Sequence, residues 1–261
     1  MITVDSGITA NEEIALAREL GMKVVITDHH ECHDELPEAE AVIDCKQAGD
    51  TYPFDSLAGV GVAFKLICAL DGDTDAMLDR YADLVALGTV ADVMPIVGEN
   101  RILVAEGLQR MEKTRNIGLQ RLLAEAGMAE RHLTASTISF VLAPRINAAG
   151  RMRMDENDEN AAPSGGYAAV NLLVENNESD AEDYGSIIDA FNQDRKSIDR
   201  HVTQEAHEII ESDPELKNRK STVIYNPRWM KGIVGIVASR LIETYFRPTV
   251  VLTQSNGFAT G

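Results

Sequence analysis

The alternation of short β-branched runs with a helical pattern at the start of the chain constrains the fold most strongly. Residues 2–5 and 23–27 form two such runs, and an amphipathic helical pattern that ends at Gly21 lies between them. A third run covers residues 41–44. Strand, helix and strand at this spacing predict a right-handed βαβ unit with parallel strands. We therefore expect an α/β fold in which a parallel sheet is flanked by helices.

Helical periodicity dominates the rest of the chain, in residues 59–70, 75–87, 99–113 (with further turns to 126), 180–212 and 232–245. Two more strand patterns, at residues 222–225 and 249–253, flank the last of these helices. This order predicts one α/β domain over residues 1–178 and a long connecting helix over residues 179–214. Residues 215–261 are expected to begin a second α/β domain.

The composition is that of a folded protein in a reducing compartment. Of the 261 residues, 44% are hydrophobic and 25% are charged, and no apolar run approaches the roughly 20 residues of a membrane-spanning helix. The N-terminus lacks the basic and apolar regions of a signal peptide. Cys32, Cys45 and Cys68 are odd in number and show no Cys-x-x-Cys spacing. These features favour a cytoplasmic protein with no membrane association.

The net charge of −18 argues against broad, non-specific binding to nucleic acid. The charge is nevertheless unevenly distributed, because residues 216–242 and 144–154 contain several Lys or Arg residues and no carboxylate. An acidic protein with two basic stretches can still guide a polyanion to one groove. Residues 151–166 are polar, aperiodic and rich in turn formers, so we expect them to form a mobile loop.

Polar side chains with metal-binding chemistry follow the first two predicted strands. Asp5 ends the first strand, and Asp28, His29 and His30 follow the second. Because ligands bind at the carboxyl ends of parallel strands, these groups are expected to lie side by side. Asp92 is a further candidate, since a carboxylate among apolar residues needs a metal or an ion-pair partner. Carboxylates and imidazoles together suit Mn²⁺, Mg²⁺, Fe²⁺ or Zn²⁺.

Simpler roles for these residues stay open. An aspartate at a strand end is commonly a turn or helix cap, and a histidine there is commonly a hydrogen-bonded polar group. The run His29-His-Glu-Cys-His33 also suggests a zinc cluster, but its ligands are too crowded for ordinary zinc spacing and no second Cys/His pair exists. The combined pattern at the two strand ends favours the metal site.

A second cluster lies in the segment Pro144-Arg-Ile-Asn-Ala-Ala-Gly-Arg151. Arg145 and Arg151 offer forked donors for phosphate oxygens, Asn147 lies between them, and the small residues let a ligand approach the backbone. The alternative is that Arg145 caps a helix end and Arg151 is a surface charge. Both interpretations stay open at this point.

Several motifs, taken in order, carry a family resemblance. They are Val4-Asp-Ser-Gly-Ile8, Asp28-His-His30, Leu57-Ala-Gly-Val-Gly-Val-Ala-Phe-Lys65, Gly88-Thr-Val-Ala-Asp-Val-Met-Pro95 and Pro144-Arg-Ile-Asn-Ala-Ala-Gly-Arg151. Together they resemble the DHH phosphoesterase superfamily, and within it the bacterial single-strand-specific exonucleases. The segments Gly232-Ile-Val-Gly-Ile-Val-Ala-Ser-Arg240 and Arg247-Pro-Thr-Val-Val-Leu252 resemble the start of the family's second, DHH-associated domain (DHHA1).

The resemblance implies a metal-dependent hydrolase of phosphodiester bonds, a 5′-to-3′ exonuclease of DNA repair and recombination, with Mn²⁺ or Mg²⁺ as cofactor. It assigns Asp5, His29 and Asp92 as metal ligands. It assigns catalytic roles to Asp28, which is expected to orient the imidazole of His29, and to His30, which is expected to face the metal and the phosphate.

The resemblance also implies which partners the protein has. Arg145, Asn147 and Arg151 are assigned to the phosphates of single-stranded DNA. Single-strand-binding protein and a helicase are the implied protein partners, and the implied oligomeric state is a monomer.

Two family features lie outside the sequence as it stands. An Asp-x-Asp strand would precede Met1, and a Gly-Ser-Gly-Arg-Ser-like segment would begin near Gly261. On the resemblance alone, the chain is therefore expected to be an internal fragment. A second metal ion would lack its carboxylates, so weak or absent nuclease activity is expected of this chain.

Two alternative functions stay open from the sequence. One is a DHH phosphodiesterase that acts on short oligonucleotides or cyclic dinucleotides, which the net charge of −18 favours and the basic stretch between Lys217 and Arg240 disfavours. The other is a non-catalytic binding or scaffold protein. The missing first motif supports this second alternative, whereas the intact Asp5, Asp28-His-His30 and Asp92 argue against it.

Overall fold

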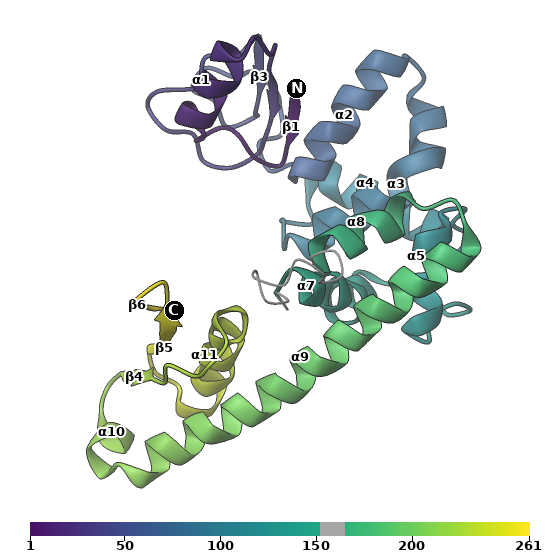
Figure 1. Ribbon diagram of the computed structural model, residues 1–261. Helices are drawn as coiled ribbons and strands as arrows, with labels where there is room; N and C mark the ends of the chain where they lie inside the picture. Colours follow the sequence, from purple (N-terminus) through teal and green to yellow (C-terminus); the bar gives the residue numbers. More distant parts are fainter. Residues whose placement is uncertain (152–164) are drawn as a thin grey trace. The chain divides into compact units, whose positions relative to one another are not determined.

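Three short parallel strands open the chain and carry the candidate site at their ends. We describe the protein from a computed structural model, which defines residues 1–151 and 165–261. The strands β1 (Ile2–Val4), β2 (Val25–Thr27) and β3 (Ala41–Ile43) pair in that order, with Thr27 beside both Val4 and Ile43. Parallel pairing brings the carboxyl ends of all three strands to one edge (Figure 1). The structure confirms the predicted parallel sheet flanked by helices.

Helices cover this sheet because their apolar faces match it. The helix α1 (Asn11–Glu19) buries Ile14 and Ala17 in a core with Ile26 of β2 and Val24, which precedes that strand. The helix α2 (Gly59–Asp71) contacts β1 and β2 and shares a core with α3 (Thr74–Ala91) and α4 (Gly98–Met111). The predicted turns beyond 113 form a separate helix, α5 (Ile117–Glu125), because Asn116 caps it by accepting a hydrogen bond from the Leu119 amide.

Short helical segments follow α5. They are α6 (Ala135–Thr137), the π-helical turn η1 (Ile138–Leu142) and α7 (Ala143–Arg151). The segment with Arg145, Asn147 and Arg151 is therefore helical. The predicted loop at 151–166 falls largely on residues 152–164, which lie outside the described residues; α8 (Gly165–Val174) follows them.

The C-terminal elements build a second core around the long helix α9 (Glu178–Ser212), which extends over 35 residues (Figure 1). After it come α10 (Pro214–Asn218), β4 (Thr222–Tyr225), α11 (Lys231–Tyr245), β5 (Thr249–Ser255) and β6 (Phe258–Thr260). The strand β5 pairs in parallel with β4 and antiparallel with β6. Val202, Ala206 and Ile210 of α9 pack against apolar residues of α11, and Trp229 lies in the same core. These elements match the predicted start of a second α/β domain.

The chain divides into two compact units, Met1–Ala143 and Pro144–Gly261. The whole of α9 belongs to the second unit. The domain boundary expected after residue 178 stays a prediction, and so does the role of α9 as a connection between domains. Among the described residues, no helix combines the length and the apolar character needed to cross a membrane.

Candidate metal centre

Asp5 leaves the first strand in a conformation that few side chains adopt. Its φ is 58°, in the left-handed region, and its amide donates to the carbonyl of Thr27 over 3.0 Å. Such strain costs of order 1–3 kcal/mol for a residue other than glycine and concentrates at functional sites. The backbone here places the carboxylate beside the first residue of α2, Gly59.

Gly59 leaves the room that the Asp5 carboxylate occupies. A Cβ atom at Gly59 would lie 2.6 Å from Cγ of Asp5, which no real packing allows. In the sequence Gly59 is one small residue within the motif of residues 57–65, and the structure shows why a side chain is excluded there.

Replacing Gly59 with alanine is therefore expected to displace the Asp5 carboxylate. Support of this kind is worth about ten- to a hundredfold in metal affinity, so we expect the affinity for Mn²⁺ to fall by that factor. Calorimetric titration with MnCl₂ measures it. Gly61→Ala, on the same helix, is the matched control, because its Cβ would meet only the Leu57 side chain, at 3.3 Å. Equal affinities in the two variants would contradict this role of Gly59.

His29 lies at the centre of the candidate site. Its ring is buried, and its Nε2 lies 2.9 Å from Oδ1 of Asp5 and 3.4 Å from Oδ2 of Asp92. Asp92 reaches this position as the residue that caps the C-terminus of α3. Within the described part of the chain, neither ring nitrogen of His29 makes a hydrogen bond, so the contact with Asp5 is close without being one. A buried nitrogen facing two carboxylate oxygens suits a divalent cation.

The structure thus brings Asp5, His29 and Asp92 together, as the sequence predicts. His30 also comes close: Asp5, His29 and His30 each offer a ligand atom within 4.8 Å of the others. His30 is half-exposed at the rim, whereas His29 is enclosed. The donor set is therefore two carboxylates and a buried imidazole, with a second imidazole beside them.

Asp28 holds His30 rather than His29, which corrects the expectation drawn from the resemblance. Its Oδ1 lies 2.7 Å from Nδ1 of His30 and accepts the amides of His29 and His30, while its Oδ2 accepts the amide of Ile8. Neither ring nitrogen of His29 bonds to this carboxylate in the described structure. The tight turn after β2 folds the side chain back onto the following amides, as aspartate does in turns.

These hydrogen bonds set the charge of the pair. Burial by itself raises the pKa of Asp28, but the bonds from the Ile8 amide and from His30, with the two further amides, lower it below its usual value. The hydrogen bond to Asp28 raises the pKa of His30 against a smaller opposing effect of burial, and the carboxylates of Asp5 and Asp92 add to the increase. Asp28 therefore stays ionised and fixes the His30 ring.

Asp44 is a buried acid that the sequence pattern does not single out. It follows β3 directly. Asp28 lies beside it at the end of the neighbouring strand β2, and the Asp28 amide donates to the carbonyl of Ile43. Burial raises the pKa of Asp44, and the neighbouring Asp28 carboxylate adds to that increase. Its Oδ1 accepts the Lys46 amide, and its Oδ2 has no hydrogen-bond partner among the described residues.

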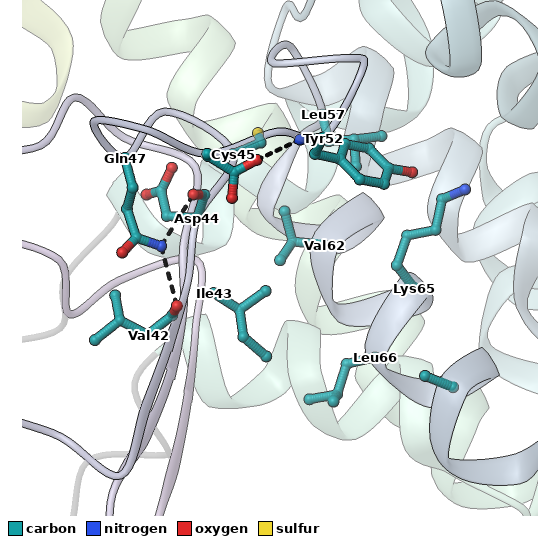
Figure 2. A pocket seen from close by; sticks show the side chains of 12 residues that line it. Val42, Ile43, Asp44, Cys45, Gln47, Tyr52, Leu57, Val62, Lys65 and Leu66 are labelled. Atoms are coloured by element: carbon teal, nitrogen blue, oxygen red, sulfur yellow. Dashed lines mark hydrogen bonds between the residues drawn. The ribbon is translucent and has the colours of Figure 1, made fainter.

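A cavity of about 410 Å³ opens on the other side of β3, between its end and α2. Figure 2 shows Ile43 extending toward Val62 and Leu66, while Gln47 turns back to bond the carbonyls of Val42 and Asp44. None of the residues predicted to bind metal or DNA lines this cavity. The cavity is mainly apolar and shares no lining residue with the candidate metal centre.

The residues predicted to bind DNA lie on α7, in the second unit. The Nε of Arg145 donates to Oδ1 of Asp189 over 3.2 Å, and its side chain is only 12% exposed. Asn147 and Arg151 are exposed, and Arg151 donates to the carbonyl of Gly232. Two of the three side chains are thus open to solvent, and Arg145 is held inside an ion pair.

Comparison with known proteins identifies relatives over almost the whole chain. Residues 1–89 match the model of the DHH family, N-terminal domain. The chain is 41% identical over 263 residues to the single-stranded-DNA-specific exonuclease RecJ of Bacillus subtilis (strain 168), covering 100% of this chain and 31% of that protein. It is 38% identical over 273 residues to the protein of the same name from Escherichia coli (strain K12), covering 98% and 45%.

Solved structures give the same result. RecJ from Thermus thermophilus in complex with Mn²⁺ is 32% identical with a TM-score of 0.80, and the match covers 97% of this chain and 36% of that one. An exonuclease RecJ bound to manganese is 32% identical with a TM-score of 0.79, covering 97% and 60%. The chain therefore spans less than half the length of the two curated relatives named above.

Proposed function

Because this chain belongs to the DHH family, we propose that it forms part of a metal-dependent phosphodiesterase that hydrolyses single-stranded DNA from its 5′ end. The observation that carries the proposal is the buried Nε2 of His29, which lies within 3.4 Å of carboxylate oxygens from both Asp5 and Asp92 and lacks a hydrogen-bond partner among the described residues. The names of the relatives from Bacillus subtilis and Escherichia coli support the substrate class.

We assign Asp5, His29 and Asp92 as the ligands of Mn²⁺ or Mg²⁺. Similar RecJ structures were solved with Mn²⁺ and with Mg²⁺, which supports this choice of ions. When bound, such an ion lowers the pKa of a coordinated water and neutralises charge that grows on the phosphoryl oxygens. The chain supplies the rigid positions of its ligands: a strained strand end, a buried imidazole and a helix C-terminus.

Asp28 and His30 serve the substrate side of the same site in this proposal. Asp28 fixes the His30 ring through Nδ1, and 57% of the His30 side chain is exposed. In the protonated ring, which the raised pKa of His30 favours, the other ring nitrogen can donate a hydrogen bond to a phosphoryl oxygen. Asp28 is a positioning residue, because both of its oxygens are engaged within the protein.

On α7, we assign Asn147 and Arg151 to direct contact with DNA phosphates, since both are exposed. Arg145 acts indirectly in this proposal, because its ion pair with Asp189 holds α7 against α9. Single-strand-binding protein, a helicase and a monomeric state follow from the resemblance alone. A pull-down and the mass in solution test them.

The proposal predicts Mn²⁺-dependent release of nucleotides from the 5′ end of a single strand and little release from a duplex. The measurement combines calorimetric titration with MnCl₂ and digestion of end-labelled oligonucleotides, with EDTA as the control. Since the chain spans only part of its relatives, Mn²⁺ binding is the primary readout. Absence of a stoichiometric Mn²⁺ site would overturn the metal assignment. Cleavage of dinucleotides without cleavage of longer strands would instead indicate the small-substrate class.

A further inference from the structure

One face of α9 carries a row of polar residues, which we call the polar stripe, in addition to the apolar residues that give the helix its periodic pattern. Asp189, Asn192, Arg195 and Asp199 follow each other at intervals of three and four residues, so they lie on one side of the helix. Asn192 and Asp199 are fully buried. A buried polar stripe of this kind requires a partner for each of its members.

The two ends of the stripe have such partners. Arg145 from α7 donates to Asp189. Arg240 from α11 binds Asp199 with both nitrogens of its fork, at distances of 2.6–3.1 Å that involve both carboxylate oxygens. Each terminal carboxylate therefore has its own arginine.

Arg195, in the middle of the stripe, has no carboxylate partner among the described residues. Its Nη2 donates to the amide oxygen of Asn192 over 3.2 Å, and its Nε makes no hydrogen bond. The amide nitrogen of Asn192 also lacks an acceptor in this part of the chain. The guanidinium is half-buried, so it is only partly hydrated by solvent.

The surroundings of Arg195 are positive overall. Burial lowers the pKa of Arg195; Asp199 opposes this decrease, and the charges of Arg151 and Arg240 add to it. Three arginines and one aspartate leave a local net charge of two positive units, in a chain with 42 acidic and 24 basic side chains. Asp199, the carboxylate that acts on Arg195, is already bound by Arg240, and no other carboxylate among the described residues pairs with Arg195, which leaves a place for a counter-ion from a ligand.

We propose that Arg195 and Arg151 form a subsite for a phosphate group of single-stranded DNA, with Asn192 holding the Arg195 guanidinium in place. The proposal rests on the substrate class proposed above and adds a binding residue to it. A planar guanidinium can bind two oxygens of one phosphate. The backbone of Arg151 packs closely against the first turn of α11: a Cβ on Gly232 would lie 2.7 Å from the Arg151 carbonyl oxygen. The positive charge at this place suits a phosphodiester.

The test measures binding without cleavage. Fluorescence anisotropy of a labelled oligothymidylate in EDTA gives the affinity of the 261-residue chain as a function of salt. Arg195→Gln is expected to weaken binding about tenfold and to reduce the slope of log K against log salt by about 0.7, the share of one phosphate contact on a single strand. The matched control is Arg200→Gln, which removes the same charge from an exposed position of α9 and should leave both quantities near the parent values.

A second readout separates a binding role from a structural one. Because Arg195 forms no ion pair among the described residues, Arg195→Gln should unfold at nearly the same temperature as the parent. A lower unfolding temperature together with unchanged binding would overturn the proposal. Equal competition by unlabelled oligothymidylate in parent and Arg195→Gln would also overturn it. Weaker competition by oligothymidylate alone in Arg195→Gln supports a backbone phosphate as the ligand, and weaker competition by inorganic phosphate or thymidine 5′-monophosphate as well supports a site that also takes a free phosphate group. The anisotropy assay in EDTA contains no free metal. A failure of the chain to bind Mn²⁺ would therefore refute the proposed function without changing the result for Arg195.

Discussion

Replacing His29 with alanine is expected to abolish stoichiometric Mn²⁺ binding and to lower single-strand hydrolysis about a thousandfold or more, because a bound metal supplies several kcal/mol of charge stabilisation in such reactions. His29 is the buried nitrogen donor, and its Nε2 faces both Asp5 and Asp92. Without it, two half-exposed carboxylates and the exposed imidazole of His30 remain. Calorimetric titration with MnCl₂ and digestion of end-labelled DNA measure the two effects.

The control for this variant is His33→Ala. His33 lies in the segment that follows β2 and is exposed, so its removal tests whether any imidazole in this segment affects the metal. Mn²⁺ affinity and hydrolysis should match the parent in His33→Ala. Unchanged stoichiometry and affinity in His29→Ala, with the circular dichroism of the parent, would remove His29 from the metal site and with it the assignment of Asp5 and Asp92.

The sequence predicts the positions of Asp5 and Asp28–His30 well because they depend on a short-range pattern. Short β-branched runs separated by a helix specify a parallel pair, and parallel pairing brings strand ends together whatever the side chains beyond them do. The approach of Asp92 depends on α3 ending at Ala91, a boundary that the periodicity places only approximately. The three residues converge as expected, and their role as metal ligands stays a prediction.

The target of Asp28 could not be predicted from the sequence. Its carboxylate has several amides and two imidazoles within reach, and the turn geometry decides among them. The same limit applies to Arg145, whose partner Asp189 lies 44 residues further along the chain. A charge pair between two helices leaves no periodic signal, so the sequence favoured neither a DNA contact nor a helix cap.

The polar stripe on α9 was missed for a related reason. The apolar positions of this helix, such as Ile188, Val202 and Ile210, give a strong periodic signal that predicts a buried face. Asn192 and Asp199 lie within that buried region, yet hydropathy assigns them to solvent. Reading polar residues at the same intervals as apolar ones would have identified Asp189, Asn192, Arg195 and Asp199 as a group.

The ion pair between Arg240 and Asp199, at one end of that stripe, is expected to contribute strongly to stability. Replacing Arg240 with glutamine is expected to destabilise the second unit by about 3 kcal/mol, because it leaves the Asp199 carboxylate buried without its charged partner. The other hydrogen bond that Asp199 accepts in the described structure comes from the Thr203 hydroxyl, over 3.4 Å. Urea unfolding followed by tryptophan fluorescence measures the change, since the single tryptophan, Trp229, lies in the core shared by α9 and α11.

The contrast with a surface pair makes the Arg240 prediction specific. Arg219 and Glu215 pair across 3.5 Å with both side chains largely exposed, so Arg219→Gln should change stability by less than about 0.5 kcal/mol. Removing both members of this pair, in which Asp199 is buried and Arg240 half-exposed, by Asp199→Leu with Arg240→Met should recover most of the stability, because no unpaired charge then remains buried. If Arg240→Gln were as stable as Arg219→Gln, the Asp199 carboxylate would need another partner or water in the folded protein. A buried charge on α9 would then be tolerated without a partner, and the missing partner of Arg195 would no longer indicate a ligand.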